Sequence, residues 1–258
     1  MIAPGFAGVE AQLWLWLLAM VRPGAAFIAA PIFGAAAVPV QLRIILSLAI
    51  GMAALNSVPF VLPPDGLASV AGVALVAAEV IAGLSLGFAL QIGYSAAFIA
   101  GETIANAMGL GFSNMVDPLT GQSTPVVGQF LSIIATFLLL AMDGHLLLIR
   151  FIVASYQALP PGNLMPAGAF EALARFGGAM FASGAIIALP VTFTLILVQL
   201  VMAMLARTAP SLNLFAVGMP ATLLAGLVLL AVGAPVMGAA ISDTLRQSLD
   251  MVQTLSGG

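Results

Sequence analysis

Uncharged, mostly apolar stretches of 20 to 35 residues dominate the chain, and shorter segments between them carry the charged residues. About 20 apolar residues in helical form cross the hydrocarbon core of a bilayer. The pattern therefore predicts five or six hydrophobic helices. The stretches are Pro23–Leu42, Ile44–Pro64, Val80–Gly101, Pro118–Met142, Phe176–Ala206 and Thr208–Ser242.

Prolines interrupt several of these apolar stretches. Proline removes one backbone hydrogen bond and kinks or ends a helix, and inside a membrane the freed carbonyl needs a protein or water partner. The interrupting residues are Pro23, Pro31, Pro39, Pro190, Pro220 and Pro235, and Pro160-Pro161-Gly162 predicts a turn. We therefore predict an all-α fold of hydrophobic, proline-kinked, membrane-type helices that pack within a larger assembly.

The composition excludes the common soluble classes of protein. Apolar residues make up 62% of the 258 residues and charged residues 6%, against about 25% charged in an average soluble domain. The net charge is −3 with six basic residues, so no basic stripe is available for a nucleic-acid backbone. With no cysteine and one histidine, a standard zinc site cannot form, and we expect neither a metal nor a cofactor.

One pair of residues superficially resembles a catalytic dyad. Ser113 lies in the segment Gly111–Asn114, and His145 is available as its base. Such a dyad requires both side chains on opposed elements within hydrogen-bond reach. Ser113 instead falls in a glycine-rich loop and His145 follows the Asp143-Gly144 turn, so we predict that the protein is not an enzyme.

Small residues favour close helix packing in one segment. Residues at four-residue spacing share one face of a helix, and such a series runs through residues 79–91. Its members are Glu79, Gly83, Gly87 and Gln91. The two glycines form a seam of small residues that lets helix backbones approach closely. Two interpretations stay open: packing against another helix of the same chain, and contact with another subunit.

Two carboxylates and one arginine stand in otherwise apolar surroundings. Buried carboxylates in membranes are costly and often functional, so Glu79 and Glu102 admit an ion-coupling role. They lie 23 residues apart, about 34 Å along a helix, and the structural alternative is that they mark its two wet ends. Arg22 is either an anchor that reaches the membrane surface or an ion-pair partner.

The segment Glu102–Gln129 joins two apolar stretches through a glycine-broken loop with an apolar tip. Loops between spans normally lie in water and carry polar residues. Because an apolar tip is costly in water, we expect it either to pack on its own protein or to line a pore, where Met and Phe form a deformable seal. The apolar residues are Met108, Leu110, Phe112, Met115 and Val116, and the polar Asp117–Gly121 follow them.

The order of several motifs resembles the FliR family of flagellar export-gate proteins. The matches extend from residue 30 to residue 220 and cover nearly the whole chain. They are Ala30–Gly34, Val38-Pro39, Arg43-Ile44, Met108–Phe112, Asp117-Pro118, Gly121, Pro125, Gly128–Leu131, Asp143–Leu147, Ser155-Tyr156, Leu159-Pro160, Leu189-Pro190, Arg207–Phe215 and Gly218–Pro220.

The resemblance implies a two-part architecture and a role in protein export. Residues 1–165 would be a FliP-like helical part with a plug loop at 108–121, and residues 166–258 a FliQ-like helical hairpin with a short polar tail. One copy would assemble with FliP and FliQ, near FlhB, into the channel that exports unfolded flagellar proteins, including those of the proximal rod. The expected location is the flagellar basal body in the bacterial inner membrane.

Two sets of site residues follow from the resemblance. The pore plug would consist of Met108, Leu110, Phe112, Met115, Val116 and Asp117. The tip of the hairpin, expected at the cytoplasmic side, would contain Arg207, Pro210 and Asn213. Local chemistry agrees with a turn at the tip, because proline and asparagine are typical turn residues.

Two alternatives to the flagellar gate remain at this stage. The first is the homologous gate of the virulence-type injectisome, which shares the architecture. The second is an ion-coupled solute transporter, which would show paired half-chain repeats with matching broken helices. The sequence has no such matching halves, so the transporter is the weaker alternative.

Overall fold

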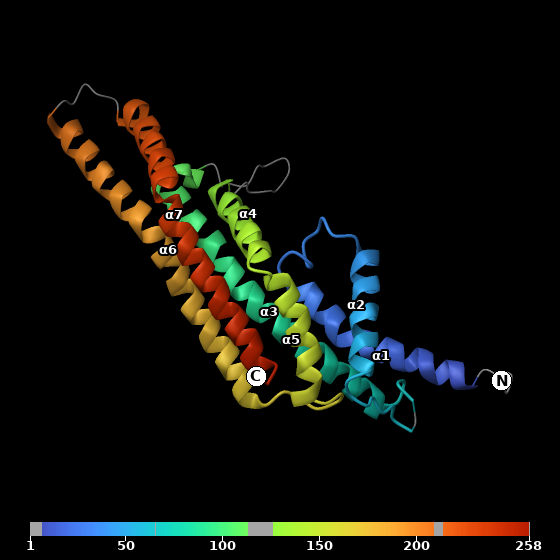
Figure 1. Ribbon diagram of the computed structural model, residues 1–258. Helices are drawn as coiled ribbons and strands as arrows, with labels where there is room; N and C mark the ends of the chain where they lie inside the picture. Colours follow the sequence, from blue (N-terminus) through green and yellow to red (C-terminus); the bar gives the residue numbers. More distant parts are fainter. Residues whose placement is uncertain (1–6, 65, 113–125, 209–213, 258) are drawn as a thin grey trace. The chain divides into compact units, whose positions relative to one another are not determined.

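The computed structural model describes residues 7–64, 66–112, 126–208 and 214–257. Over these residues the chain forms seven α-helices and one short 3-10 helix, η1, and no β-strand, which confirms the all-α fold. The α-helices are α1 (Ala7–Ala29), α2 (Val40–Leu55), α3 (Val70–Ala107), α4 (Val126–Ala141), α5 (Gly144–Ala158), α6 (Ala167–Thr208) and α7 (Leu214–Leu255), and η1 is Leu110–Phe112 (Figure 1).

Four helices are long and apolar enough to cross a membrane: α1, α3, α6 and α7. Helices α4 and α5 make a fifth span if they count as one broken segment. The break lies at Asp143, whose φ of 54° is left-handed. The predicted stretch Ile44–Pro64 does not provide a span, because α2 has only 16 residues and ends before Asn56.

The prolines divide the helices less often than the sequence predicts. Pro31 and Pro39 lie between α1 and α2, where they confirm the predicted interruption. Helices α1, α6 and α7 instead continue through their internal prolines. One proline removes a single backbone hydrogen bond, and a helix of 42 residues keeps the bonds on both sides of it. The internal prolines are Pro23, Pro190, Pro220 and Pro235.

The first of two compact units comprises residues 1–92, 139–177 and 246–258. Within it α1 packs against α2 and α5. The approach of α1 to α2 is close at Gly51, where an added Cβ would lie 2.6 Å from the Ala19 carbonyl. Fully buried side chains fill the space between the helices. They include Leu18, Phe27, Leu86, Ile152 and Tyr156.

The second unit comprises residues 93–138 and 178–245, which belong mainly to α3, α4, α6 and α7. Helices α6 and α7 lie side by side in it (Figure 1). An added Cβ on Gly233 of α7 would lie 3.6 Å from Val191 Cγ2 of α6. The two compact units interleave along the sequence. The predicted division at residue 165 concerns the resemblance of each part to a sister subunit, and it stays a prediction.

Large apolar side chains of α6 and α7 are exposed along much of both helices. Only 22% of the most apolar part of α6 and 17% of that of α7 is buried within the chain, against 50% for α3. Phe181 and Val232, for example, are 69% and 72% exposed. Contiguous exposed apolar surface of this extent indicates contact with lipid or with other proteins.

Candidate functional site

The most elaborate polar site in the described residues is a buried ion pair between α1 and α3. The side chains of Arg22 and Glu79 have no exposed surface. Arg22 Nε donates to Glu79 Oε2 at 3.0 Å, and Arg22 Nη2 donates to Glu79 Oε1 at 2.8 Å. The guanidinium and carboxylate therefore face each other as a two-pronged pair, the strongest geometry for such an interaction.

Further hydrogen bonds attach α5 and the turn before α6 to this pair. Arg22 donates to Ser155 Oγ at 3.0 Å and to the Leu159 carbonyl at 2.9 Å. The Gly162 N–H donates to Glu79 Oε1 at 3.2 Å. We call these residues, with Tyr156, the ionic junction.

Tyr156 closes the ionic junction on one side. Its ring centroid lies 4.0 Å from Arg22 Cζ, and its hydroxyl donates to the Ala19 carbonyl at 3.1 Å. A guanidinium over an aromatic face gains a favourable cation–π interaction. The charges of the pair are thus surrounded by partners, which offsets the large cost of removing them from water.

The geometry decides between the two alternatives for Arg22 and removes one of the two for Glu79, whose ion-coupling role stays a prediction. Arg22 is an ion-pair partner and not a surface anchor, because its side chain is fully buried. The expectation that Glu79 marks a wet end of a helix is wrong, because α3 begins nine residues earlier at Val70 and the Glu79 side chain is fully buried beside Arg22 of α1. Glu102 is half-buried on the same helix, and its Oε1 would lie 2.8 Å from a Cβ added to Gly128 of α4.

The predicted glycine seam lies against α1 of the same chain. A Cβ added to Gly83 would collide with the Arg22 carbonyl and lie 2.8 Å from Ala25 Cβ. A Cβ added to Gly87 would collide with the Ala26 carbonyl. The close approach of α1 thus accounts for both glycines, and Gln91 is half-buried one turn further along α3. Their predicted role in contact with another subunit stays a prediction.

We expect Gly83→Ala to destabilise the protein, since its methyl group would push on the backbone that carries Arg22. Overpacking of this kind costs about 1–3 kcal/mol. The matched control is Gly178→Ala in α6, where an added Cβ meets nothing within 4 Å and helix propensity improves. Thermal unfolding midpoints of the purified variants test this expectation. A midpoint for Gly83→Ala at or above that of Gly178→Ala would contradict it.

The base of the predicted plug, Ala107 and Met108 at the end of α3, contacts α6 and α7. Gln199 Nε2 donates to the Ala107 carbonyl at 2.7 Å, and Thr222 Oγ1, which donates to the Met219 carbonyl of its own helix at 3.0 Å, lies 3.4 Å from the Met108 carbonyl. Met108 is 2% exposed, and its Sδ would lie 2.8 Å from a Cβ added to Gly226. The main-chain carbonyls at the end of a helix accept no hydrogen bond within that helix, so they are available for contacts of this kind.

The other predicted plug and tip residues are only partly described. Leu110 is half-buried in η1, which also contains Phe112. Arg207 is exposed in the last turn of α6. Met115, Val116, Asp117, Pro210 and Asn213 lie outside the described residues, as does Ser113 of the superficial dyad. The roles assigned to all of these residues stay predictions.

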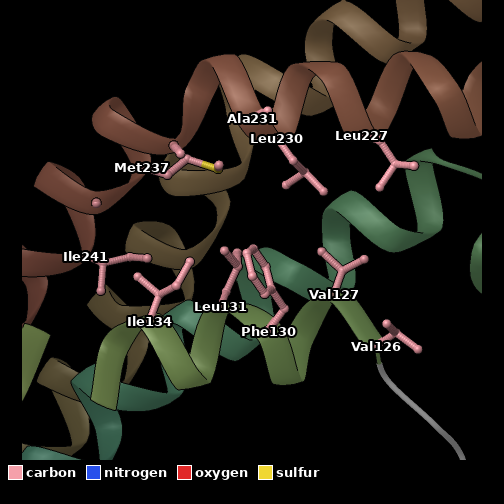
Figure 2. Close-up of a pocket in the computed structure, with 12 residues that line it drawn as sticks. Val126, Val127, Phe130, Leu131, Ile134, Leu227, Leu230, Ala231, Met237 and Ile241 are labelled. Carbon is pink, nitrogen blue, oxygen red and sulfur yellow. The ribbon is translucent and has the colours of Figure 1, made fainter. Parts of the chain in front are cut away.

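An apolar groove separates α4 from α7 in the second unit. Figure 2 shows side chains of α4, such as Phe130 and Ile134, pointing toward Leu230 and Met237 of α7. The groove has a volume of about 370 Å³.

Within the described part of the chain, no group of three or more His, Cys, Asp or Glu side chains is placed to hold a metal ion.

The helices define a multi-pass membrane protein, and comparison with known proteins gives its family. The chain matches the family described as bacterial export proteins, family 1, over residues 13–248. It is 37% identical over 209 residues to the flagellar biosynthetic protein FliR of Pectobacterium carotovorum subsp. carotovorum, covering 81% of this chain and 79% of that protein. The chain therefore belongs to family 1 of the bacterial export proteins, the family of FliR, as the sequence motifs predict.

Two further relatives show the same extent of similarity. The flagellar biosynthetic protein FliR of Escherichia coli (strain K12) is 33% identical over 227 residues, which cover 88% of this chain and 85% of that protein. The protein of the same name from Bacillus subtilis (strain 168) is 30% identical over 244 residues, which cover 93% of both chains.

Proposed function

We propose that this chain is a subunit of the flagellar type III export gate and forms, with FliP and FliQ, the channel through which unfolded flagellar proteins leave the cytoplasm. The observation that carries the proposal is the similarity to flagellar biosynthetic FliR proteins over most of the chain. In this role the protein is a structural transport component of the bacterial inner membrane and flagellar basal body, and it catalyses no reaction.

Exposed apolar surface supports an assembly with other helical subunits. Helices α6 and α7 present long apolar faces, and the groove between α4 and α7 is lined by aliphatic and aromatic side chains. Apolar helices of FliP and FliQ would cover these faces through side-chain packing, which drives helix association in membranes. Part of this surface would remain in contact with lipid.

We also propose that residues 1–165 correspond to a FliP-like part and residues 166–258 to a FliQ-like hairpin. The helix arrangement supports this division, because α6 begins at Ala167 after the turn that contains Gly162. Two helices of 42 residues then follow, and they pack side by side. Their connection, with Arg207, Pro210 and Asn213, would face FlhB at the cytoplasmic side.

The plug proposal concerns residues 108–121. A loop that seals a pore needs a fixed base and an apolar tip, and the base is held by the Gln199 hydrogen bond and by the packing of Met108 against Gly226 of α7. The tip would contain Leu110, Phe112, Met115 and Val116, with Asp117 at its return. Flexible Met and bulky Phe side chains would exclude water from the closed channel and yield to a passing chain.

Co-purification and export together test the proposed function. In a strain that lacks its own copy, the tagged chain should co-purify with FliP and FliQ and restore secretion of flagellar proteins from background to the wild-type level. Because the chain has no cysteine, Thr208→Cys introduces a unique thiol, which should form a disulfide with a cysteine placed in FlhB. Restored secretion without FliP and FliQ in the purified complex would contradict the proposed channel.

A further inference from the structure

A polar cavity lies between α5 and the C-terminal end of α7, within the first compact unit. The two helix ends touch, since a Cβ added to Gly257 would collide with Ala158 Cβ. The cavity is open to the surface, since six of its nine lining residues, Arg150 among them, are exposed, and it has a volume of about 660 Å³. Its lining residues are Leu147, Arg150, Phe151, Ala154, Gln157, Ala158, Gln253, Ser256 and Gly257.

Arg150 gives this cavity a positive charge without a matching acid. Among the described residues, none that lines the cavity is acidic. Arg22 pairs with Glu79 and Arg175 pairs with Glu171, whereas the Arg150 side chain forms no ion pair or hydrogen bond with the described residues. Its guanidinium is thus available for a ligand.

The position of Arg150 makes an anion from outside the chain the expected partner. Arg150 lies in α5, which together with α4 forms either a broken membrane span or a re-entrant segment. Charged side chains in such segments are costly and are almost always paired. Basic pockets between membrane helices commonly bind anionic lipid headgroups.

The other lining groups indicate the chemistry of the ligand. Gln157 and Gln253 contribute carboxamides, which both donate to and accept from hydroxyl groups. Leu147 and Phe151 add apolar surface on the same side of α5 as Arg150. An amphiphile with a phosphate, headgroup hydroxyls and an acyl chain matches all three features. A single carboxylate side chain of a partner protein would leave most of the 660 Å³ unfilled.

The end of α7 does not prevent the binding of an anion. Carbonyl groups in the last turn of a helix carry partial negative charge. The Ser256 hydroxyl donates to the Gln253 carbonyl at 2.7 Å, and the Gly257 N–H donates to the Thr254 carbonyl at 3.2 Å. These bonds satisfy part of the negative end of α7 and leave Arg150 as the charge of the cavity.

We propose that this cavity binds a phospholipid of the phosphatidylglycerol type. Arg150 binds the phosphate through two N–H groups, in the forked geometry that guanidinium offers to phosphate. Gln157 and Gln253 bind the hydroxyls of the headgroup, and Phe151 contacts the start of an acyl chain. The site does not depend on the proposed export function, so either proposal can fail alone.

Native mass spectrometry of the full-length chain, purified in mild detergent with the subunits that accompany it, measures this binding. The probes are phosphatidylglycerol, diacylglycerol with the same acyl chains, and inorganic phosphate. We expect phosphatidylglycerol to bind at least tenfold more tightly than diacylglycerol. Arg150→Gln should weaken phosphatidylglycerol binding about tenfold, and Arg150→Lys should weaken it less. The matched control, Arg175→Gln, removes an exposed arginine outside the cavity and should leave binding unchanged.

A photo-crosslinking residue at Gln157 gives a second readout that does not require Arg150→Gln to fold. We expect it to attach to phosphatidylglycerol in membranes. Attachment to a protein instead would overturn the proposal in favour of an acidic partner subunit. Wild-type affinity in Arg150→Gln, an equal loss in Arg175→Gln, or equal binding of inorganic phosphate alone would also overturn it.

Discussion

Replacing Glu79 with leucine is expected to remove most of the chain from the membrane fraction. The change leaves the Arg22 guanidinium buried without its carboxylate, and breaking one partner of such a pair costs about 3–5 kcal/mol. The Gly162 N–H loses its acceptor as well. Because net stabilities are only about 5–15 kcal/mol, a loss of this size removes a large part of the stability of the fold. Immunoblots of membranes and unfolding midpoints of the purified protein measure the effect.

The double variant Arg22→Met/Glu79→Leu should recover part of the lost protein. It removes both charges and fills their space with apolar atoms, and such replacements of buried pairs are often neutral or stabilising. Recovery stays partial because Ser155 and the Leu159 carbonyl lose the donor that Arg22 provides.

Glu171→Leu is the matched control for the single variant. It breaks the ion pair with Arg175. In this pair the Arg175 side chain is 80% exposed and the Glu171 side chain 64% exposed. Exposed pairs contribute about 0–1 kcal/mol, so the control should accumulate normally. Equal losses of protein in the two single variants would show that the ionic junction has no special structural role.

Deleting residues 110–116 is expected to leave the export complex assembled and to make cells permeable to small ions. If these residues form the plug, their removal opens a path driven by about 2.3 kcal/mol per charge per 100 mV. The deletion spares the hydrogen bond of Gln199 to the end of α3 and the buried Met108 side chain. Conductance of the reconstituted complex and sensitivity of cells to membrane-impermeant solutes measure the leak.

A loop of equal length made of glycine and serine is the control for the deletion. It keeps the connection between α3 and α4 but lacks the bulky apolar side chains, so we expect it to leak nearly as much as the deletion. Wild-type conductance in both variants, with normal co-purification of the other subunits, would contradict the plug proposal.

The helices follow from the apolar pattern, whereas their ends depend on competing local effects. The four-residue series from Glu79 to Gln91 correctly predicts one helix face. Residues four positions apart point to the same side of a helix whatever surrounds it. The pattern overestimates the span at Ile44–Pro64, where α2 ends at Leu55. Prolines are ambiguous in the sequence, because Pro31 lies outside a helix while Pro190 lies within one.

The ionic junction is less accessible to sequence reasoning than the helices are. The unusual positions of Arg22 and Glu79 are visible, but their separation of 57 positions in the sequence conceals the pairing. Ser155 and Tyr156 belong to a recognisable motif, yet nothing in it indicates a contact with Arg22 across 133 residues of chain. The turn at Gly162 is predicted by its prolines, but its hydrogen bond to Glu79 comes from tertiary packing.

The ionic junction holds the linker, residues 159–166 between α5 and α6, and this has a consequence for evolution. Arg22 binds the Leu159 carbonyl and Glu79 binds the Gly162 N–H, so both contacts use main-chain atoms. At these two contacts the side chains of the linker take no part, so the contacts themselves do not fix which residues stand there. Gly162 is the exception, because its φ of 87° is unfavourable for other residues. Selection should act on the backbone course of this segment more strongly than on its residue identities.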